Sequence, residues 1–167
     1  MSLAAAVAVC DVAGGGALVK WPNDVVLRRG DGLAKLGGIL LEGRPQAGWV
    51  VIGIGLNVAV DHARLPHDLQ TTAATLGRGG EAIEPLLAEL LPALQRRLTS
   101  PPEQMLAAWR GRDALLGARV RWSSGPGIAE GVDAAGVAEG VDAAGRLLVA
   151  TESGRRVALD SGEVHLL

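Results

Sequence analysis

The chain has 167 residues, of which 49% are hydrophobic, so it can bury one medium core or one core with a small satellite domain. Its formal net charge of -2 and pI near 5.9 exclude the basic field that non-specific binding to a DNA backbone requires. The opening apolar run, residues 3–10, is too short to cross a membrane and lacks the basic flank of a signal peptide.

The core has an unusual composition, because the sequence has 24 glycines and neither Phe nor Tyr. Val, Leu, Ile and Ala must form most of it, with Trp21, Trp49, Trp109 and Trp122 as its only aromatic side chains. Truncating a fully buried tryptophan costs about 3 to 5 kcal/mol. The single cysteine, Cys10, excludes an internal disulfide and favours a reducing cytoplasm as the location of the protein.

The first predicted element is a helix over residues 3–13, ended by three glycines at 14–16. It is apolar on nearly every face, so protein must cover it on all sides. It also opens the chain. We therefore expect that an upstream part of the fold is missing from these residues.

Several short apolar segments then predict an antiparallel sheet. Pro22 ends the first strand, and glycine-rich turns separate the others. The predicted strands cover residues 17–21, 25–27, 36–41 and 49–60, with turns at 28–32 and 43–48.

Two helices follow. From Glu81 to Leu98 the leucines recur at helical spacing; Pro85 fits a first turn, whereas Pro92 predicts a kink or break. Residues 103–110 form a second, shorter helix.

After Asp113 the pattern changes to short strands and glycine turns, which predicts a satellite barrel of about 50 residues. The predicted domains are therefore 1–113 and 114–167. The strands expected in the second are 118–122, 146–151, 155–159 and 164–167.

A nine-residue block, residues 128–136, is followed at once by a near copy at 137–145. Two copies are too few for a solenoid. A surface hairpin can absorb the duplication, because lengthening a loop by nine residues costs about 1 kcal/mol or less. Either copy could supply the strand, and the acidic residues lack the spacing of a calcium loop.

The residues that are candidates for binding and catalysis lie in three blocks on successive apolar segments. They are Lys20-Trp21-Pro22-Asn23-Asp24, Lys35-Leu36-Gly37-Gly38-Ile39-Leu40-Leu41-Glu42 and Gly53-Ile54-Gly55-Leu56-Asn57-Val58. Lys35 opens a strand beside Gly37 and Gly38, whose missing side chains permit close approach of a ligand. Such a lysine suits an anion, although a solvated lysine at a strand end has the same local sequence.

The other polar residues of these blocks also have two interpretations. Asn23 and Asn57 can donate and accept, so the pair can read an adenine edge, or they can form turns. Asp24 can help to hold Mg²⁺ or can cap a turn. Lys20 faces the ligand or braces its strand, and we interpret Trp21 as a core residue.

Other site types gain no support from the sequence. Residues 53–55 lack the third glycine and following helix of a dinucleotide fingerprint. His62, His67 and His165 have no metal-ligand spacing, and no nucleophile with a base partner can be named.

Together, in this order and spacing, the three blocks resemble the core of biotin protein ligases. The resemblance implies an α+β fold: a partial catalytic domain like that of class II aminoacyl-tRNA synthetases, mostly antiparallel sheet with helices, and then a small SH3-like barrel. It covers residues 3 to about 112 and the barrel through residues 161–164. The block at residues 20–24, joined to this barrel, favours biotin over lipoate as the substrate.

The resemblance implies a role for each site residue. Lys35 contacts both the biotin carboxylate and the nucleotide phosphate as the catalytic cation, with Gly37 and Gly38 beside the substrate. The remaining implied contacts are Asn23, Asn57 and Lys20 to the nucleotide and Asp24 to the metal.

The implied reaction has two steps. Biotin and MgATP give biotinyl-5′-AMP, and a lysine of a biotin carrier domain, such as that of acetyl-CoA carboxylase, then attacks it to form an amide. DNA and membranes are not expected partners. An exposed sheet edge favours a homodimer.

One departure from the family's pattern stands out: these residues contain no Gly-Arg-Gly-Arg loop, which in the family closes over the adenylate. The helix-turn-helix of regulatory members is absent as well. We therefore expect this chain alone to be inactive or impaired. The alternative is a noncatalytic remnant whose barrel binds a protein partner.

Overall fold

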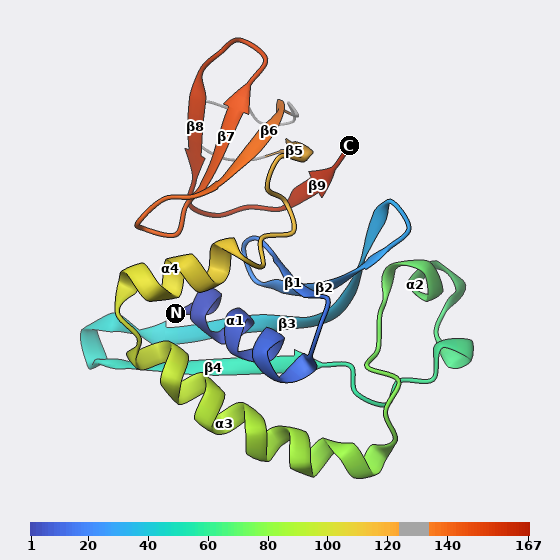
Figure 1. The fold of residues 1–167 in the computed structure, drawn as a ribbon. Coiled ribbons are helices and arrows are strands. Elements are labelled where there is room, and N and C mark those ends of the chain that lie inside the picture. The colour runs from blue at the N-terminus through green and yellow to red at the C-terminus, as the bar shows by residue number, and fades with distance from the viewer. Residues whose placement is uncertain (124–133) are drawn as a thin grey trace.

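The computed structural model describes residues 1–123 and 134–167 and shows two antiparallel sheets with helices (Figure 1). The first sheet has the order β1-β2-β3-β4. Its strands are β1 (Ala17–Lys20), β2 (Asp24–Arg29), β3 (Gly32–Arg44) and β4 (Trp49–Leu56). The predicted antiparallel sheet is confirmed, with a longer third strand and a fourth that ends at Leu56, because the amide of Asn57 bonds to Leu36 O and the chain then leaves the sheet.

Helix α1 (Ser2–Ala13) is the buried helix that the sequence predicts. Its residues 4–10 are all buried, between the sheet, α3 (Ile83–Thr99) and α4 (Pro102–Arg110) (Figure 1). Burial raises the pKa of the Cys10 thiol to about 12, so the thiol stays protonated at neutral pH. Alanine at five of its positions lets the neighbouring helices approach closely.

An ion-pair network ties α1 to the two later helices. Asp11 accepts hydrogen bonds from Arg97 Nε at 2.7 Å and from Arg112 Nη2 at 2.7 Å. All three side chains are largely buried, with 15%, 25% and 29% exposed for Asp11, Arg97 and Arg112. Removing the carboxylate would leave two guanidinium groups unpaired in a partly dry environment.

Helix α3 runs without interruption from Ile83 to Thr99, so of the two outcomes expected at Pro92, a kink or a break, the break was wrong. Pro92 lies on the exposed side of the helix, where water can satisfy the carbonyl that loses its partner. Leu86, Leu90 and Ala93 are buried on the other side and hold both halves of the helix against the core. Packing of this face outweighs the local cost of the proline.

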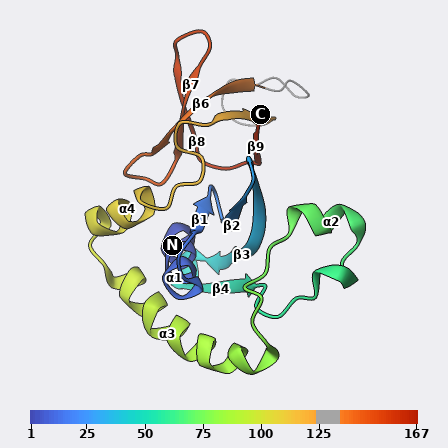
Figure 2. The ribbon, with the colours of Figure 1, turned by 45° about the vertical axis from the view of Figure 1, so that its right-hand side comes forward.

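The segment between β4 and α3 forms an excursion that contains α2 (His67–Thr72) and three-residue 3-10 helices at His62–Arg64 and Gly80–Ala82 (Figure 2). It returns to the sheet at two points. Arg29 Nη1 donates to Gln70 O at 2.9 Å, and Ala74 N donates to Lys35 O at 2.7 Å. The second bond brings α2 beside the part of β3 that carries Lys35.

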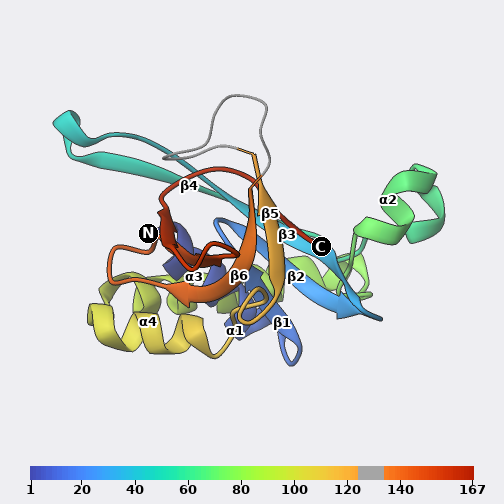
Figure 3. The ribbon, with the colours of Figure 1, turned by 90° about the horizontal axis from the view of Figure 1, so that it is seen from above.

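The second sheet has the order β8-β7-β6-β5-β9 and lies over the β1–β2 side of the first sheet (Figures 1 and 3). Its strands are β5 (Arg119–Trp122), β6 (Ala134–Val141), β7 (Leu147–Thr151), β8 (Arg156–Leu159) and β9 (Val164–Leu166). Four agree with the predicted strands. The fifth, β6, takes residues from both copies of the duplicated block, 134–136 from the first and 137–141 from the second; residues 128–133 of the first copy lie outside the described residues.

Hydrogen bonds join the two sheets. Val19 N donates to Arg112 O at 2.7 Å, and Ala114 N donates to Val19 O at 2.9 Å, so the connecting segment runs beside β1. Trp21 Nε1 donates to Gly145 O at 3.0 Å, which confirms Trp21 as a buried structural residue. Asp113 lies in this connecting segment, and burial raises the pKa of its carboxyl group. No helix in the described ranges is long and apolar enough to cross a bilayer.

The tryptophans provide a matched test of the core. Trp109 is completely buried, whereas Trp49 is 49% exposed at the start of β4 and was wrongly expected in the core. We predict that Trp109→Ala lowers the free energy of unfolding by about 3 to 5 kcal/mol, and that Trp49→Ala lowers it by about 1 kcal/mol or less. Urea denaturation followed by circular dichroism measures both. Equal losses would contradict this core.

Gly37 and Gly55 provide a second pair. A Cβ on Gly37 would lie 2.5 Å from Gly55 O, whereas the nearest heavy atom to a Cβ on Gly55 would be at 3.9 Å. We predict that Gly37→Ala destabilises the protein by about 1 to 3 kcal/mol, because β3 and β4 must separate locally. Gly55→Ala should change stability by less than about 1 kcal/mol. The same urea titration measures the stability of both variants. An unchanged free energy of unfolding for Gly37→Ala would show that β3 and β4 lie further apart.

Candidate functional site

The candidate site is centred on an ion pair between β3 and β2. Lys35 Nζ lies 2.6 Å from Asp24 Oδ1, with 55% of the lysine side chain and 21% of the aspartate side chain exposed. The ammonium is therefore accessible to solvent and to ligands, while the carboxylate is mostly covered. Lys20 is the antiparallel partner of Asp24 on β1, so three charged residues lie on neighbouring strands.

A bulge in the sheet produces this arrangement. Val25 pairs with Gly37 but Val26 pairs with Lys35, so β3 has one extra residue, Leu36, at this point. Leu36 and Gly37 are consecutively buried, which breaks the alternation of the strand. As a result Lys35 lies on the exposed face, close enough to Asp24 to pair with it.

The two glycines of this block have separate roles. A Cβ on Gly38 would lie 3.4 Å from Lys35 Cε and 3.6 Å from Asp24 Oδ1, so the space above Gly38 holds the ion pair. The space above Gly37 holds the backbone of Gly55. Atoms of the protein itself therefore occupy the space beside Gly37 and Gly38. The substrate contact expected for these glycines stays a prediction.

The two asparagines differ in their surroundings. Asn57 Nδ2 donates to Ala74 O at 3.0 Å and to Lys35 O at 3.4 Å, which leaves its carbonyl oxygen as the atom to offer a ligand. Asn23 Nδ2 donates to Ile39 O at 2.8 Å and ties the turn before β2 to β3. Only Asn57 lines a cavity beside Lys35.

Two open cavities meet at Lys35. The first, of about 400 Å³, is lined by Lys35, Gly37, Gly38, Gly55, Asn57, Leu69, Thr72 and Ala73. The second, of about 410 Å³, is lined by Lys20, Asp24, Val26, Leu33, Lys35, Thr72, Glu163, His165 and Leu166. Because Lys35 and Thr72 line both, we treat the cavities as two arms of one cleft.

Sequence reasoning missed part of this cleft. Thr72 comes from α2, His165 from β9 of the second sheet and Glu163 from the residue just before β9, all far from the three blocks in the sequence. His165 Nε2 lies 3.8 Å from Glu163 Oε2. No sequence signal marks these residues, because only the hydrogen bonds between distant segments bring them to Lys35.

The site has little capacity to hold a metal by itself. In the described part of the chain, no three His, Cys, Asp or Glu side chains gather closely enough to bind a metal ion. Asp24 offers one mostly covered carboxylate beside Lys35. One carboxylate together with nucleotide phosphates is nevertheless a normal environment for Mg²⁺.

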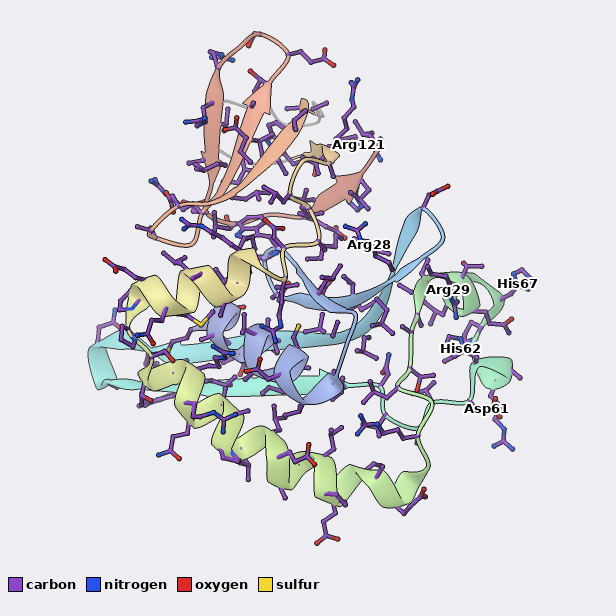
Figure 4. All side chains as sticks on the ribbon, viewed as in Figure 1. Arg28, Arg29, Asp61, His62, His67 and Arg121 are labelled. Carbon is purple, nitrogen blue, oxygen red and sulfur yellow. The ribbon has the colours of Figure 1, made fainter. Side chains whose placement is uncertain are left out.

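The polar side chains labelled in Figure 4 line neither arm of the cleft. His62 and His67 are on the α2 excursion, and they line neither cavity. Arg28 of β2 and Arg121 of β5 come from the facing sides of the two sheets. Neither lines the cavity that contains Lys20 and His165.

Comparison with known proteins agrees with this geometry. Residues 127–167 match the family described as the biotin protein ligase C terminal domain. The biotin–[acetyl-CoA-carboxylase] ligase of Mycobacterium tuberculosis is 35% identical over 149 residues, which are 87% of this chain and 52% of that protein. The chain thus spans about half the length of the curated relatives that it matches.

Solved structures show the same fold. The apo biotin protein ligase of Aquifex aeolicus superimposes with a TM-score of 0.80 at 22% identity, over 99% of this chain and 74% of that one. The same ligase in complex with biotin and ATP gives a TM-score of 0.71 at 24% identity, over 99% and 70% of the two chains. The chain is therefore similar to biotin protein ligases over most of its length, and its residues 127–167 match their C-terminal domain.

Proposed function

We propose that this chain takes part in the ATP-dependent activation of biotin and in its transfer to a lysine of a biotin carrier protein. The observation that carries the proposal is the accessible Lys35 ammonium, which lies where the two arms of the cleft meet. A fixed cation at such a point suits a reaction between two anions.

Lys35 would act in the first step. The biotin carboxylate attacks the α-phosphorus of ATP, the bond to the β-phosphate oxygen breaks, and pyrophosphate leaves. Each reactant is negatively charged, so a cation between them offsets their repulsion and stabilises charge at phosphorus. Lys35 is already paired with Asp24 in this structure, and a bound phosphate would compete for the same ammonium.

The adenylate would lie in the arm beside Asn57. The side-chain carbonyl oxygen of Asn57 can accept a hydrogen bond from the exocyclic amine of adenine, and Gly55, which lines the same arm, has no side chain to obstruct a flat ring. The expected nucleotide contacts of Asn23 and Lys20 remain proposals, and Asn23 would have to give up its bond to Ile39 to use its amide group.

Mg²⁺ would bind with the nucleotide. Asp24 is the carboxylate in place for it, and nucleotide phosphates would supply further oxygen ligands. The ion would neutralise part of the phosphate charge during activation.

The acceptor lysine would act in the second step. Its neutral amine attacks the acyl carbon of biotinyl-5′-AMP, AMP leaves, and an amide remains on the carrier. The M. tuberculosis relative is named for acetyl-CoA carboxylase, and we propose a carrier of this type for the present chain.

We also propose a cytoplasmic location, since Cys10 is a free, buried thiol. A homodimer stays a prediction that light scattering can test.

The role of Lys35 can be tested in a longer polypeptide that joins these residues to the region preceding the match in the M. tuberculosis relative. We predict that Lys35→Ala lowers biotin-dependent exchange of pyrophosphate into ATP by about a hundredfold or more, because a preorganised cation is lost. Arg155→Ala, at an exposed turn, should leave the rate unchanged and serves as the control. Full activity of Lys35→Ala would reject the assigned role.

The 167 residues by themselves should form little or no biotinyl-5′-AMP. They contain no Gly-Arg-Gly-Arg segment, and their cleft is open to solvent, so water and the adenylate would exchange freely. Thin-layer separation of products from labelled ATP measures the adenylate directly. Robust biotinylation of a carrier domain by this chain would refute the prediction.

A further inference from the structure

The second arm of the cleft lies where the two sheets meet. His165 on β9 and Glu163 just before it line this cavity together with Lys35. Leu33 of β3 lines it as well, and Figures 1 and 2 show β9 beside the β2–β3 hairpin. The cation proposed for biotin activation and a histidine of the second sheet therefore share one cavity of about 410 Å³.

The imidazole of His165 is accessible in this cavity. Val164 is buried and His165 is exposed, because successive side chains of a strand point to opposite faces. The His165 side chain is 47% exposed, and its Nε2 lies 3.8 Å from Glu163 Oε2, which is too far for a hydrogen bond. Among the described residues no hydrogen bond engages the imidazole, so it can accept a proton from a bound molecule.

Charged groups surround His165 from both sheets. Arg121 is its antiparallel partner on β5, so these two side chains lie on the same face of the second sheet. The other charged groups line the same cavity and are Lys20 on β1, Asp24 on β2, Lys35 on β3 and Glu163 before β9. This mixture of charges suits a step in which a cationic lysine side chain meets an acyl phosphate.

Transfer of biotin to a lysine needs a proton acceptor. The attacking nitrogen becomes positively charged as it bonds to the acyl carbon, and it must lose a proton to become an amide. Lysine ammonium groups already hold their protons at neutral pH, and Asp24 is paired with Lys35 at 2.6 Å. A carboxylate is a weaker base than an imidazole by about two pKa units. Histidine titrates near neutral pH and is the commonest general base.

We propose that His165 is the proton acceptor in the transfer of biotin to the carrier lysine, which enters through the arm of the cleft that His165 lines. The neutral amine bonds to the acyl carbon of biotinyl-5′-AMP, and the bond from that carbon to the phosphate oxygen breaks. AMP leaves with the electron pair of the broken bond, and one proton passes from the nitrogen to the imidazole. The inference rests on the proposed function and assigns a residue of the second sheet to its second step.

The test measures the two steps separately, in the longer polypeptide described for Lys35. Biotin-dependent exchange of pyrophosphate into ATP reports the first step. Single-turnover transfer from preformed biotinyl-5′-AMP to a carrier domain reports the second. We expect His165→Ala to lower the transfer rate at neutral pH by about a hundredfold and to leave the exchange rate unchanged, because only the second step uses the imidazole.

Two further measurements distinguish proton transfer from a structural role. Imidazole added to the buffer should restore part of the transfer rate of His165→Ala, because a free base can occupy the space of the lost ring. In the parent polypeptide the transfer rate should rise as the pH passes through the titration of an imidazole, and His165→Ala should lack this rise.

His67→Ala is the matched control. His67 is an exposed histidine at the start of α2 that lines neither arm of the cleft. Its replacement should change neither rate. Both variants should keep the circular dichroism spectrum of the parent, since neither side chain is part of the core.

Three results would overturn the assignment of His165: an unchanged transfer rate in His165→Ala, a loss that imidazole does not relieve, or an equal loss of pyrophosphate exchange. A parent polypeptide that exchanges no pyrophosphate would overturn the proposed function and this assignment with it. Normal exchange by the parent, together with one of the first three results, would overturn the role of His165 alone.

Discussion

The ion pair between Lys35 and Asp24 is the interaction on which the candidate site depends. It exists because a one-residue bulge shifts β3 against β2, and because Gly38 leaves the space that the two side chains occupy. At 2.6 Å the pair holds the ammonium in one place without burying it. The lysine therefore pays little of the desolvation cost that full burial would impose, and it stays available to an incoming anion.

The sheet and helices serve to hold that bulge in place. Gly37 allows β3 to approach the backbone of Gly55 on β4 closely, and α1 covers the buried face of the sheet. The bond from Trp21 to Gly145 and the pairing of residues 112–114 with β1 set the second sheet over this side of the molecule. The β9 strand thereby reaches the cleft. The second sheet is thus part of the site, although its sequence carries none of the three blocks.

Local patterns predicted much of the fold. Periodicity, glycine and proline act over a few residues. They therefore predicted the alanine-rich helix, the strands that carry the three blocks and the short strands after Asp113. Effects that depend on distant partners could not be predicted. Pro92 is tolerated because the other face of α3 is packed, and Trp49 is exposed because it lies at the turn that joins β3 to β4. Thr72, Glu163 and His165 reach the cleft only through long-range contacts.

The most direct measurement of the central claim is a crystal structure with biotinyl-5′-AMP bound to this chain joined to the region that precedes the match in the M. tuberculosis relative. The account predicts that the phosphate accepts a hydrogen bond from Lys35 Nζ, and that the adenine lies in the arm beside Asn57. An adenylate bound elsewhere, with Lys35 still paired only to Asp24, would contradict it.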